Sequence, residues 1–476
     1  MYGSKFTGIG IYVERLVEYL ASHDRENEYV LFLSASGMFD CKVDAPNFRK
    51  IEADVRHYSF GEQAKFPILI ARERLDLMHF THFNAPIAYR GRTVVTIHDL
   101  TLTFYPGRKM TSSAHRFAYD ATIRSVCRRA KRIFAVSAHT RKDLVEILDV
   151  PEERIAVIHN GIDRERFEVP VSEERIAQVK KKLGIERKYF LYTGVFREHK
   201  NLVRLVEAFS PIALKYHDID LVVAGKEDPG YRDVRDKIVE LGLGGRVRLP
   251  GFVDDEDIVP LYRGAEAYVF PSLYEGFGLP VVEAMAAGVP VLCSKGSSLT
   301  EVAGEGNALF FNPLRVETIT QAMDRILSEP ELRTELIAKG RERAKKYSWT
   351  SVGEAVHAEY LALKPETPEN RTIVGENEGA DHEAGAESGI PSVGKRVGQA
   401  GPSAVRSFAE RLAKLVGKTR GERVAPSEAS GETVEIPMEC MTEFPKDGAA
   451  VDAESIGTET AMADTGNERN EAEGKV

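Results

Sequence analysis

The stretch that decides the fold reads Glu275-Gly276-Phe277-Gly278-Leu279-Pro280-Val281-Val282-Glu283-Ala284-Met285-Ala286-Ala287-Gly288. Its first two glycines lack a Cβ, so the backbone N–H groups around them can approach a ligand closely. Pro280 suits the first turn of a helix, and Gly288 is a natural C-terminal stop. The N-terminus of this helix directs unpaired N–H groups and partial positive charge at the preceding loop, which predicts a phosphate site.

Two carboxylates lie eight residues apart in this stretch. Glu275 stands in the loop and Glu283 in the first turns of the helix, so they can flank one ligand from two sides. Carboxylates accept hydrogen bonds from sugar hydroxyls, while backbone N–H groups hold phosphates. The spacing alone fits equally a strand, loop and helix with two ordinary surface glutamates, so that alternative stays open at this point.

The chain around this stretch alternates apolar runs with helical patterns. The runs read as buried strands at 29–33, 75–80, 92–97, 131–136, 154–158, 189–193, 220–224, 267–270 and 289–293. Several lack strict polar alternation, as parallel strands covered on both faces do. The alternation predicts an α/β fold, and the number of strands predicts two doubly wound domains with a break near 164–186. Ligands of such domains bind at the carboxyl ends of the strands.

Two further segments stand where a predicted strand ends. Residues 194–201 follow one strand and open a helix, for which Asn201 is a good N-cap. Lys200 in this segment carries a positive charge that can face an anionic ligand. His98 and Asp99 end another strand, although a single histidine at a strand end is more often structural than catalytic.

The whole string from residue 275 to 286 resembles the E-x7-E signature of a large family of retaining GT-B glycosyltransferases, family four. The resemblance implies that Glu275 holds the transferred sugar and that Glu283 binds the ribose hydroxyls. It also implies that backbone amides contact the sugar and phosphate at three residues, Phe277, Gly278 and Leu279. The resemblance covers about residues 1–363.

Other positions match this family as well. Lys200 fits the family lysine, in a loop that opens at Gly194. Many members place an arginine directly after that glycine, whereas this sequence has Val195, so Arg197 is a candidate substitute without a positional match. His98 matches the histidine that lies beside the reacting sugar, which implies a catalytic role for it.

The resemblance implies a GT-B fold of two Rossmann-like domains. Residues 1–165 form the expected acceptor domain, 166–348 the expected nucleotide-sugar domain, and 349–363 a helix that returns to the first domain. The implied enzyme is a retaining, metal-independent hexosyltransferase whose donor substrate is a nucleoside-diphosphate sugar and which needs no cofactor. The first-half motifs resemble bacterial mannosyltransferases of surface-polysaccharide assembly, so we expect mannose as the sugar and a glycan or lipid-linked hydroxyl as the acceptor.

Two other classes of protein stay open. One is a nucleotide-sugar-binding partner subunit that has lost transfer activity, and the other is a GT-B epimerase. The residues that discriminate between the classes are all present in the sequence and favour the transferase: His98, Lys200, Glu275 and Glu283.

Composition bears on the partners of the protein, on its cysteines and on the end of the chain. The net charge is −9, and an acidic protein is a poor candidate for nucleic-acid binding. The four cysteines are far apart in sequence, which argues against a zinc or redox pair and fits a reducing cytoplasm. Residues 364–476 are rich in Glu, Gly, Ala and Ser, so we expect them to be disordered. Within them, residues 403–420 have the pattern of a basic amphipathic helix, which predicts peripheral contact with the inner face of a membrane; a transient helix without a partner is the alternative.

The beginning of the chain departs from the family pattern. Gly8 and Gly10 resemble the glycine loop between the family's first strand and first helix, near the phosphates and the acceptor. The residues from Met1 to Phe6 have neither the Val/Ile run nor the length of a buried strand. We therefore predict that the first strand is missing because the true start lies upstream; a domain that tolerates the gap is the alternative.

Overall fold

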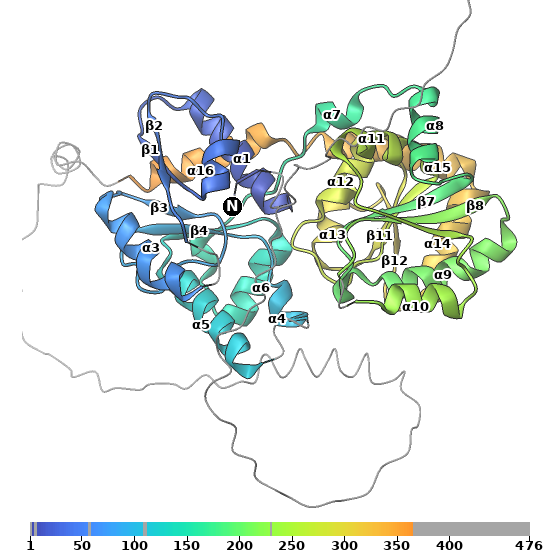
Figure 1. Ribbon diagram of the computed structural model, residues 1–476, viewed down its shortest axis with the longest axis horizontal. Coiled ribbons are helices and arrows are strands. Elements are labelled where there is room, and N and C mark those ends of the chain that lie inside the picture. The colour runs from blue at the N-terminus through green and yellow to red at the C-terminus, as the bar shows by residue number, and fades with distance from the viewer. Residues whose placement is uncertain (1, 4–6, 56–58, 108–111, 229–230, 365–476) are drawn as a thin grey trace, which may run out of the picture. The chain divides into compact units, whose positions relative to one another are not determined.

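The computed structural model describes residues 2–3, 7–55, 59–107, 112–228 and 231–364, all of which belong to one compact unit (Figure 1). Residues 365–476 lie outside the described residues. They include the predicted tail after its first residue and the amphipathic helix predicted at 403–420. Within the described ranges, no helix combines the length and the apolar character needed to cross a bilayer. We call the described residues up to 163, together with the last helix, the N-terminal domain, and residues 164–348 the C-terminal domain.

The C-terminal domain contains a parallel sheet of six strands. They are β7 (Lys188–Thr193), β8 (Ile219–Ala224), β9 (Val247–Gly251), β10 (Ala267–Phe270), β11 (Val291–Ser294) and β12 (Leu309–Phe311). Their order in the sheet is β12-β11-β10-β7-β8-β9, so the succession of strands reverses between β7 and β10. Strands β8, β10 and β11 are buried along their whole length, as expected of parallel strands covered on both faces.

The N-terminal domain divides its parallel strands between two sheets. One pairs β1 (Tyr29–Leu33) with β2 (Phe48–Glu52). The other has the order β3-β4-β5-β6 and consists of β3 (Met78–Phe80), β4 (Thr93–Ile97), β5 (Arg132–Ala135) and β6 (Ile155–Val157). Because residues 4–6 lie outside the described ranges, the predicted absence of a first strand stays a prediction.

Helices lie between most consecutive strands, although β3 leads into β4 without one. Those of the N-terminal domain are α1 (Thr7–His23), α2 (Ala35–Asp40), α3 (Phe60–Arg72), α4 (Thr101–Phe104), α5 (Ser113–Arg129), α6 (Ala138–Leu148), the 3-10 turn η3 (Glu152–Arg154) and α16 (Trp349–Ala362). Those of the C-terminal domain are α7 (Arg164–Glu168), α8 (Glu173–Lys182), the 3-10 turn η4 (Glu198–Lys200), α9 (Leu202–Lys215), α10 (Asp233–Glu240), α11 (Asp255–Arg263), α12 (Leu279–Ala286), α13 (Ser297–Ala303), α14 (Val316–Ser328) and α15 (Pro330–Ala344). In Figure 1, α9, α10 and α14 lie on one side of the C-terminal sheet and α8, α11, α12 and α15 on the other. The α/β fold with parallel sheets in two domains that the sequence predicts is confirmed.

The sequence missed three strands and the start of one helix. It missed β2, β9 and β12, because β2 mixes charged with apolar residues, β9 contains Pro250 and β12 has only three residues. It also placed Gly8 and Gly10 in a loop, whereas both lie in the first turn of α1. Glycine disfavours a helix by about 1 kcal/mol, and the buried apolar face that follows on α1 outweighs this cost.

The last helix packs on the first. α16 and α1 share a hydrophobic cluster with β4 and β5, whose fully buried members include Tyr12, Leu16, Leu20, Val94, Phe134, Val352 and Val356. The close approach needs Gly353, because a Cβ at that position would overlap the ring of Tyr19. Through α16, the end of the described chain becomes part of the N-terminal domain.

The chain crosses between the two domains twice, and the two crossing segments touch. Ile162 in the first forms a parallel β-bridge with Ser348 in the second. The Ile162 N–H donates to the Tyr347 carbonyl at 3.3 Å. Gly161 lies so close to the backbone of Trp349 that any Cβ at that position would overlap it. The connection between the domains is therefore a packed pair of segments.

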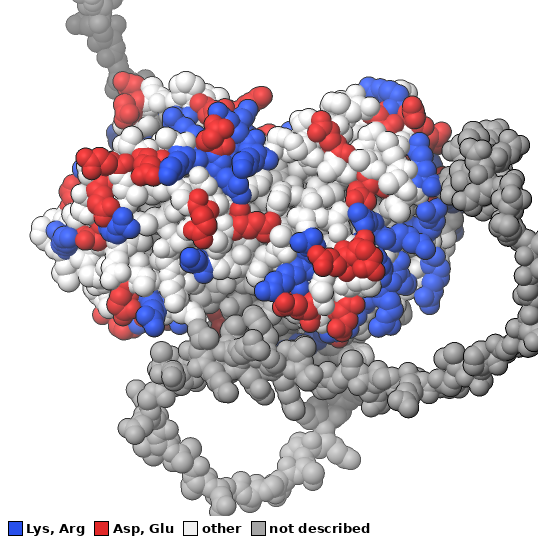
Figure 2. All heavy atoms as spheres, turned by 180° about the vertical axis from the view of Figure 1, so that it is seen from behind, with Lys and Arg blue, Asp and Glu red and all other residues white. Residues whose placement is uncertain are grey.

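The surface carries both charges side by side. Figure 2 shows one face on which Lys and Arg gather in several areas, with Asp and Glu next to them. Lys182, for example, lies 3.0 Å from Asp254 and 2.6 Å from Asp257. An anionic ligand would therefore need local groups, since this face is not uniformly basic.

Candidate active site

Two loops meet where the strand order of the C-terminal sheet reverses, which is where doubly wound domains bind ligands. One loop follows β7 and the other follows β10. The Leu273 N–H donates to the His199 carbonyl at 2.7 Å. The Lys200 Nζ lies 2.6 Å from Glu275 Oε1, and the two side chains are only 17% and 13% exposed. The structure thus brings together two charged residues that the sequence predicted from separate motifs.

Asn201 fixes the first of these loops to the end of β10. It occupies the N-cap position of α9, as predicted, but its side chain makes no cap hydrogen bond. The amide Nδ2 donates instead to the carbonyls of Pro271 at 3.1 Å and Pro313 at 2.8 Å. Its backbone is left-handed with φ 60°, a conformation that asparagine tolerates better than most residues.

The loop after β10 leads directly into the N-terminus of α12. Gly278 adopts a left-handed backbone with φ 97°, and a Cβ there would lie 2.6 Å from a methyl group of Leu299. Pro280 occupies the first turn of α12, as predicted. The first-turn N–H groups and the helix dipole therefore face the loop that carries Glu275, an arrangement that suits a phosphate. Phe277 is buried, and contact between its backbone amide and a ligand stays a prediction.

Glu283 lies one turn into α12. The Tyr262 hydroxyl donates to Glu283 Oε2 at 3.3 Å. Burial raises the pKa of Glu283 to about 7, although the Tyr262 hydrogen bond acts in the opposite direction. The carboxyl group therefore changes its charge within the range in which an enzyme works.

His98 follows β4 in the N-terminal domain and reaches the same loop. Its Nε2 donates to the Thr81 carbonyl at 3.0 Å, which leaves Nδ1 as the acceptor of the neutral ring. Burial lowers the pKa of His98, so the ring is neutral at pH 7. A Cβ on Gly276 would overlap the His98 carbonyl oxygen, so the backbones of the two segments are in contact.

Asp99 has a local structural task. Its Oδ1 accepts a hydrogen bond from the Thr101 N–H at 2.8 Å, at the start of α4.

The sequence reasoning missed the residues that tie the Glu275 loop to the N-terminal domain. The Tyr274 hydroxyl donates to Asp143 Oδ2 at 2.6 Å and accepts from the Leu100 N–H at 3.2 Å. The Thr140 hydroxyl donates to the Gly276 carbonyl at 3.3 Å. Thr140 and Asp143 both lie on α6, more than 130 residues from their partners, so no local pattern could reveal these contacts.

The predicted glycines lie at different distances from the loop. A Cβ on Gly8 would lie 3.2 Å from Leu279 Cδ1, so the first turn of α1 contacts the first residue of α12. Gly10 is buried in the same turn of α1. Gly194 has φ 148°, and a Cβ there would lie 2.8 Å from the Tyr192 hydroxyl. Gly8 and Gly194 thus permit close packing near the site.

Arg197 is exposed in the loop after β7, and its part in donor binding stays a prediction. In the part of the chain that the structure describes, no group of three or more His, Cys, Asp or Glu side chains is arranged to hold a metal ion. Metal independence stays a prediction from the resemblance.

Known proteins resemble this chain across both domains. The sequence models described as Glycosyltransferase Family 4 and as Glycosyl transferases group 1 match residues 6–166 and 175–343. O-antigen chain mannosyltransferase B of Escherichia coli is 31% identical over 373 residues, 72% of this chain and 93% of that protein. An uncharacterised glycosyltransferase of Methanocaldococcus jannaschii is 29% identical over 311 residues, 62% of this chain and 78% of the relative.

A solved structure shares the fold. The Anabaena protein HepE in complex with UDP-glucose superimposes with a TM-score of 0.60. The alignment covers 76% of this chain and 98% of that chain at 16% identity. At this level of identity, the likeness concerns the arrangement of helices and strands.

Proposed function

This chain belongs to the glycosyltransferases of family 4 and has the GT-B fold, and from that premise we propose that it transfers a hexose with retention of configuration. The donor is a nucleoside-diphosphate sugar, and the acceptor is a hydroxyl of a glycan or of a lipid-linked sugar. One observation carries this proposal. Glu275, which pairs with Lys200, lies before the N-terminus of α12, on a loop that contacts the backbone of His98.

We propose a place for each part of the donor. The diphosphate lies at the first turn of α12, where N–H groups and Lys200 balance its charge. Glu275 accepts hydrogen bonds from hydroxyls of the transferred sugar, and Glu283 accepts them from the ribose. His98 faces the sugar from the N-terminal domain as a neutral ring.

The proposed reaction exchanges one bond at the anomeric carbon for another. The bond to the diphosphate oxygen breaks, the acceptor hydroxyl oxygen forms the new bond, and the hydroxyl proton passes to the departing diphosphate. Negative charge grows on the diphosphate as the bond breaks, so a positive charge preorganised beside it lowers the barrier. We propose that Lys200 and the α12 dipole provide this charge.

Mannose is the sugar that we propose first, and surface-polysaccharide assembly is the proposed setting. The similarity to O-antigen chain mannosyltransferase B supports both choices. The direct test incubates the full chain with GDP-mannose and other nucleotide-sugars plus a mannose-terminated oligosaccharide, and determines the new linkage by NMR. An α-linked product from the α-linked donor supports the proposal. A β-linked product would contradict retention, an epimerised donor would favour an epimerase, and binding without turnover would favour a partner subunit.

Lys200→Ala is expected to lower kcat about 100-fold, the size seen when one preorganised charge-stabilising donor is lost. Initial rates at saturating donor measure this effect. Lys200→Arg keeps the positive charge and is expected to retain part of the rate. Lys339→Ala is a matched control, because Lys339 pairs with Glu335 at the surface. An unchanged kcat in Lys200→Ala would remove Lys200 from the reaction.

Donor binding is expected to strengthen roughly tenfold between pH 6 and pH 8, because the ionised fraction of a group with a pKa of about 7 grows by that factor. The ionised Glu283 carboxylate is the better acceptor for ribose hydroxyls. Calorimetric titration should use an intact nucleotide-sugar, since a free terminal phosphate titrates near pH 6 itself.

Glu283→Gln is expected to abolish this pH dependence. The same shift in pKa has the opposite effect on stability. Because the pKa of Glu283 is higher in the folded chain than in the unfolded chain, its contribution to the free energy of unfolding falls as pH rises from about 4.5 to 7. The variant should therefore melt higher relative to wild type at pH 8 than at pH 5. A wild-type affinity that does not vary with pH would contradict this assignment of Glu283.

A further inference from the structure

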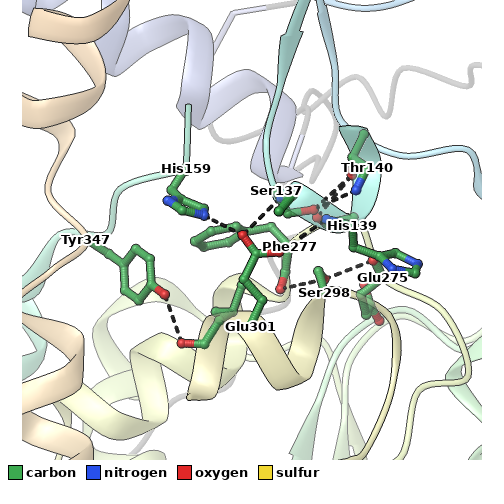
Figure 3. Close-up of polar contacts among 12 residues, drawn as sticks. Ser137, His139, Thr140, His159, Glu275, Phe277, Ser298, Glu301 and Tyr347 are labelled. Carbon is green, nitrogen blue, oxygen red and sulfur yellow. Dashed lines mark hydrogen bonds and ion pairs between the residues drawn. The ribbon is translucent and has the colours of Figure 1, made fainter. Parts of the chain in front are cut away.

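The short helix α13 holds the Glu275 loop by its first two side chains. The Ser297 hydroxyl oxygen accepts a hydrogen bond from the Glu275 N–H at 3.2 Å. The Ser298 hydroxyl lies within hydrogen-bond distance of two carbonyls, those of Glu275 at 2.9 Å and Phe277 at 3.0 Å. Figure 3 shows Ser298 between these two residues. The backbone on both sides of Glu275 is thus fixed from α13.

The next turn of α13 reaches the other domain. Glu301 Oε1 accepts from the Ala138 N–H at 2.9 Å, and Oε2 accepts from the His139 N–H at 3.2 Å. His159 Nε2 also lies 2.7 Å from Glu301 Oε1. In Figure 3, the Glu301 carboxylate points away from α13 towards Ser137 and His159. One carboxylate on α13 therefore contacts two separate segments of the N-terminal domain.

These contacts complete the N-cap of α6. The first N–H groups of a helix have no partner inside the helix. Ser137 caps α6 in the usual way, since its hydroxyl oxygen accepts from the Thr140 N–H at 3.0 Å. The two N–H groups that Ser137 does not bind, those of Ala138 and His139, are the ones that Glu301 binds.

The electrostatics favour an ionised Glu301. A negative charge at a helix N-terminus is stabilised by the helix dipole. Burial alone would raise the pKa of Glu301, but the hydrogen bonds from His159 and from the two amides outweigh it, and the pKa is lowered. The cap is thus made by a full negative charge.

The same turn of α6 also holds the Glu275 loop directly, because the Thr140 hydroxyl donates to the Gly276 carbonyl. We propose that Glu301 is a positioning residue, which completes the N-cap of α6 from the other domain and so keeps the Glu275 loop against His98 for transfer. This inference rests on the proposed function, since it names what holds that site together. Glu301 itself touches no reacting group.

The rest of α13 does not depend on the Glu301 carboxylate. The Arg343 side chain donates to the carbonyls of Glu301 and Val302, and the Tyr347 hydroxyl donates to the Val302 carbonyl at 2.9 Å. Ser297 and Ser298 hold its first turn. A change confined to the end of the Glu301 side chain should therefore leave the C-terminal domain folded and able to bind nucleotide.

Glu301→Gln tests the proposal in the full chain. Its amide group is isosteric, but one of its two terminal atoms is a donor, so it cannot accept from both N–H groups of α6. We expect kcat to fall roughly 10- to 100-fold, the size associated with lost hydrogen bonds to a charged group. The Kd for GDP and the Tm should stay near their wild-type values. Glu305→Gln is the matched control, because Glu305 is exposed and lies 3.6 Å from Lys295 at the surface.

His159→Gln adds a second, independent variant. If His159 acts only through Glu301, the double variant should lose little more activity than Glu301→Gln alone. If the two residues act independently, the fold-losses of kcat in the two single variants should multiply. An unchanged kcat in Glu301→Gln would overturn the proposal. A Tm and a GDP affinity that fall in parallel with kcat would also overturn it, because they would indicate a purely structural role.

Hydrogen exchange gives a readout that needs no activity. The N–H groups of Ala138 and His139 should exchange faster in Glu301→Gln than in wild type, while peptides from β10 and α12 stay unchanged. Equal exchange at α6 would overturn the proposed contact. If wild type transfers no sugar but this difference in exchange appears, the proposed function fails and the contact between α13 and α6 stands.

Discussion

Replacing Glu275 with alanine is expected to reduce the rate of transfer about 100- to 1000-fold. This is the range for loss of one preorganised polar group in an active site. The carboxylate is the group proposed to hold the transferred sugar, and it pairs with Lys200 at 2.6 Å. The loop should keep its shape, because Ser297 and Ser298 bind the backbone of Glu275 and not its side chain.

Three measurements separate lost chemistry from lost structure in this variant. Initial rates give the loss of transfer, a thermal melt reports folding, and the Kd for GDP reports the phosphate site. Glu275→Gln keeps the shape of the side chain and shows whether the charge matters. Glu317→Gln is the control, because Glu317 is exposed on α14. Transfer at a near wild-type rate in Glu275→Ala would defeat the assignment.

Gly276→Ala is expected to lower kcat about 100-fold, because a displacement of about 1 Å at an active site can cost that much. A Cβ on Gly276 would overlap the carbonyl oxygen of His98 and lie 2.9 Å from the Cβ of Asp99. Neither atom is at the end of a flexible side chain, so the loop and the end of β4 must separate to make room.

The control for this variant is another glycine. Gly244→Ala adds the same methyl group in the same domain, where nothing lies within 4 Å of the new Cβ, and should leave kcat unchanged. The Kd for GDP should change little in Gly276→Ala, because the nucleotide contacts that we propose come from the C-terminal domain. Full activity in Gly276→Ala would mean that the Glu275 loop and His98 are not in contact when transfer occurs.

Local sequence predicts the parts of this fold in which a residue type constrains its own backbone. The buried run at Ala267–Phe270, the proline in the first turn of α12 and the glycine after its end each constrain the backbone where they stand. A loop carboxylate and a helix N-terminus could therefore be predicted together. Gly276 is different, since its neighbour is the carbonyl of His98, 178 residues earlier in the chain.

Contacts across domains are the parts that local sequence does not reveal. Glu301 sits in a helix with no unusual pattern, and Tyr274 reads as an ordinary core aromatic. Their partners on α6 are identified only when two domains with separate cores pack together. Arg197, close in sequence to Lys200, is exposed, and its part in donor binding stays a prediction. Sequence patterns predicted the groups on each loop better than the groups that hold the loops in place.

The paired crossing segments restrict how the two domains can move. Sliding one domain along the joint would break the bridge between Ile162 and Ser348. Twisting one domain against the other would wrap the two crossing segments around each other. Bending across the pair keeps both segments in contact, so we expect the joint to act as a hinge. Opening by tilt changes contacts least near the hinge and most far from it. A tilt of this kind keeps the register of the two halves, because Ile162 and Ser348 stay paired at the joint.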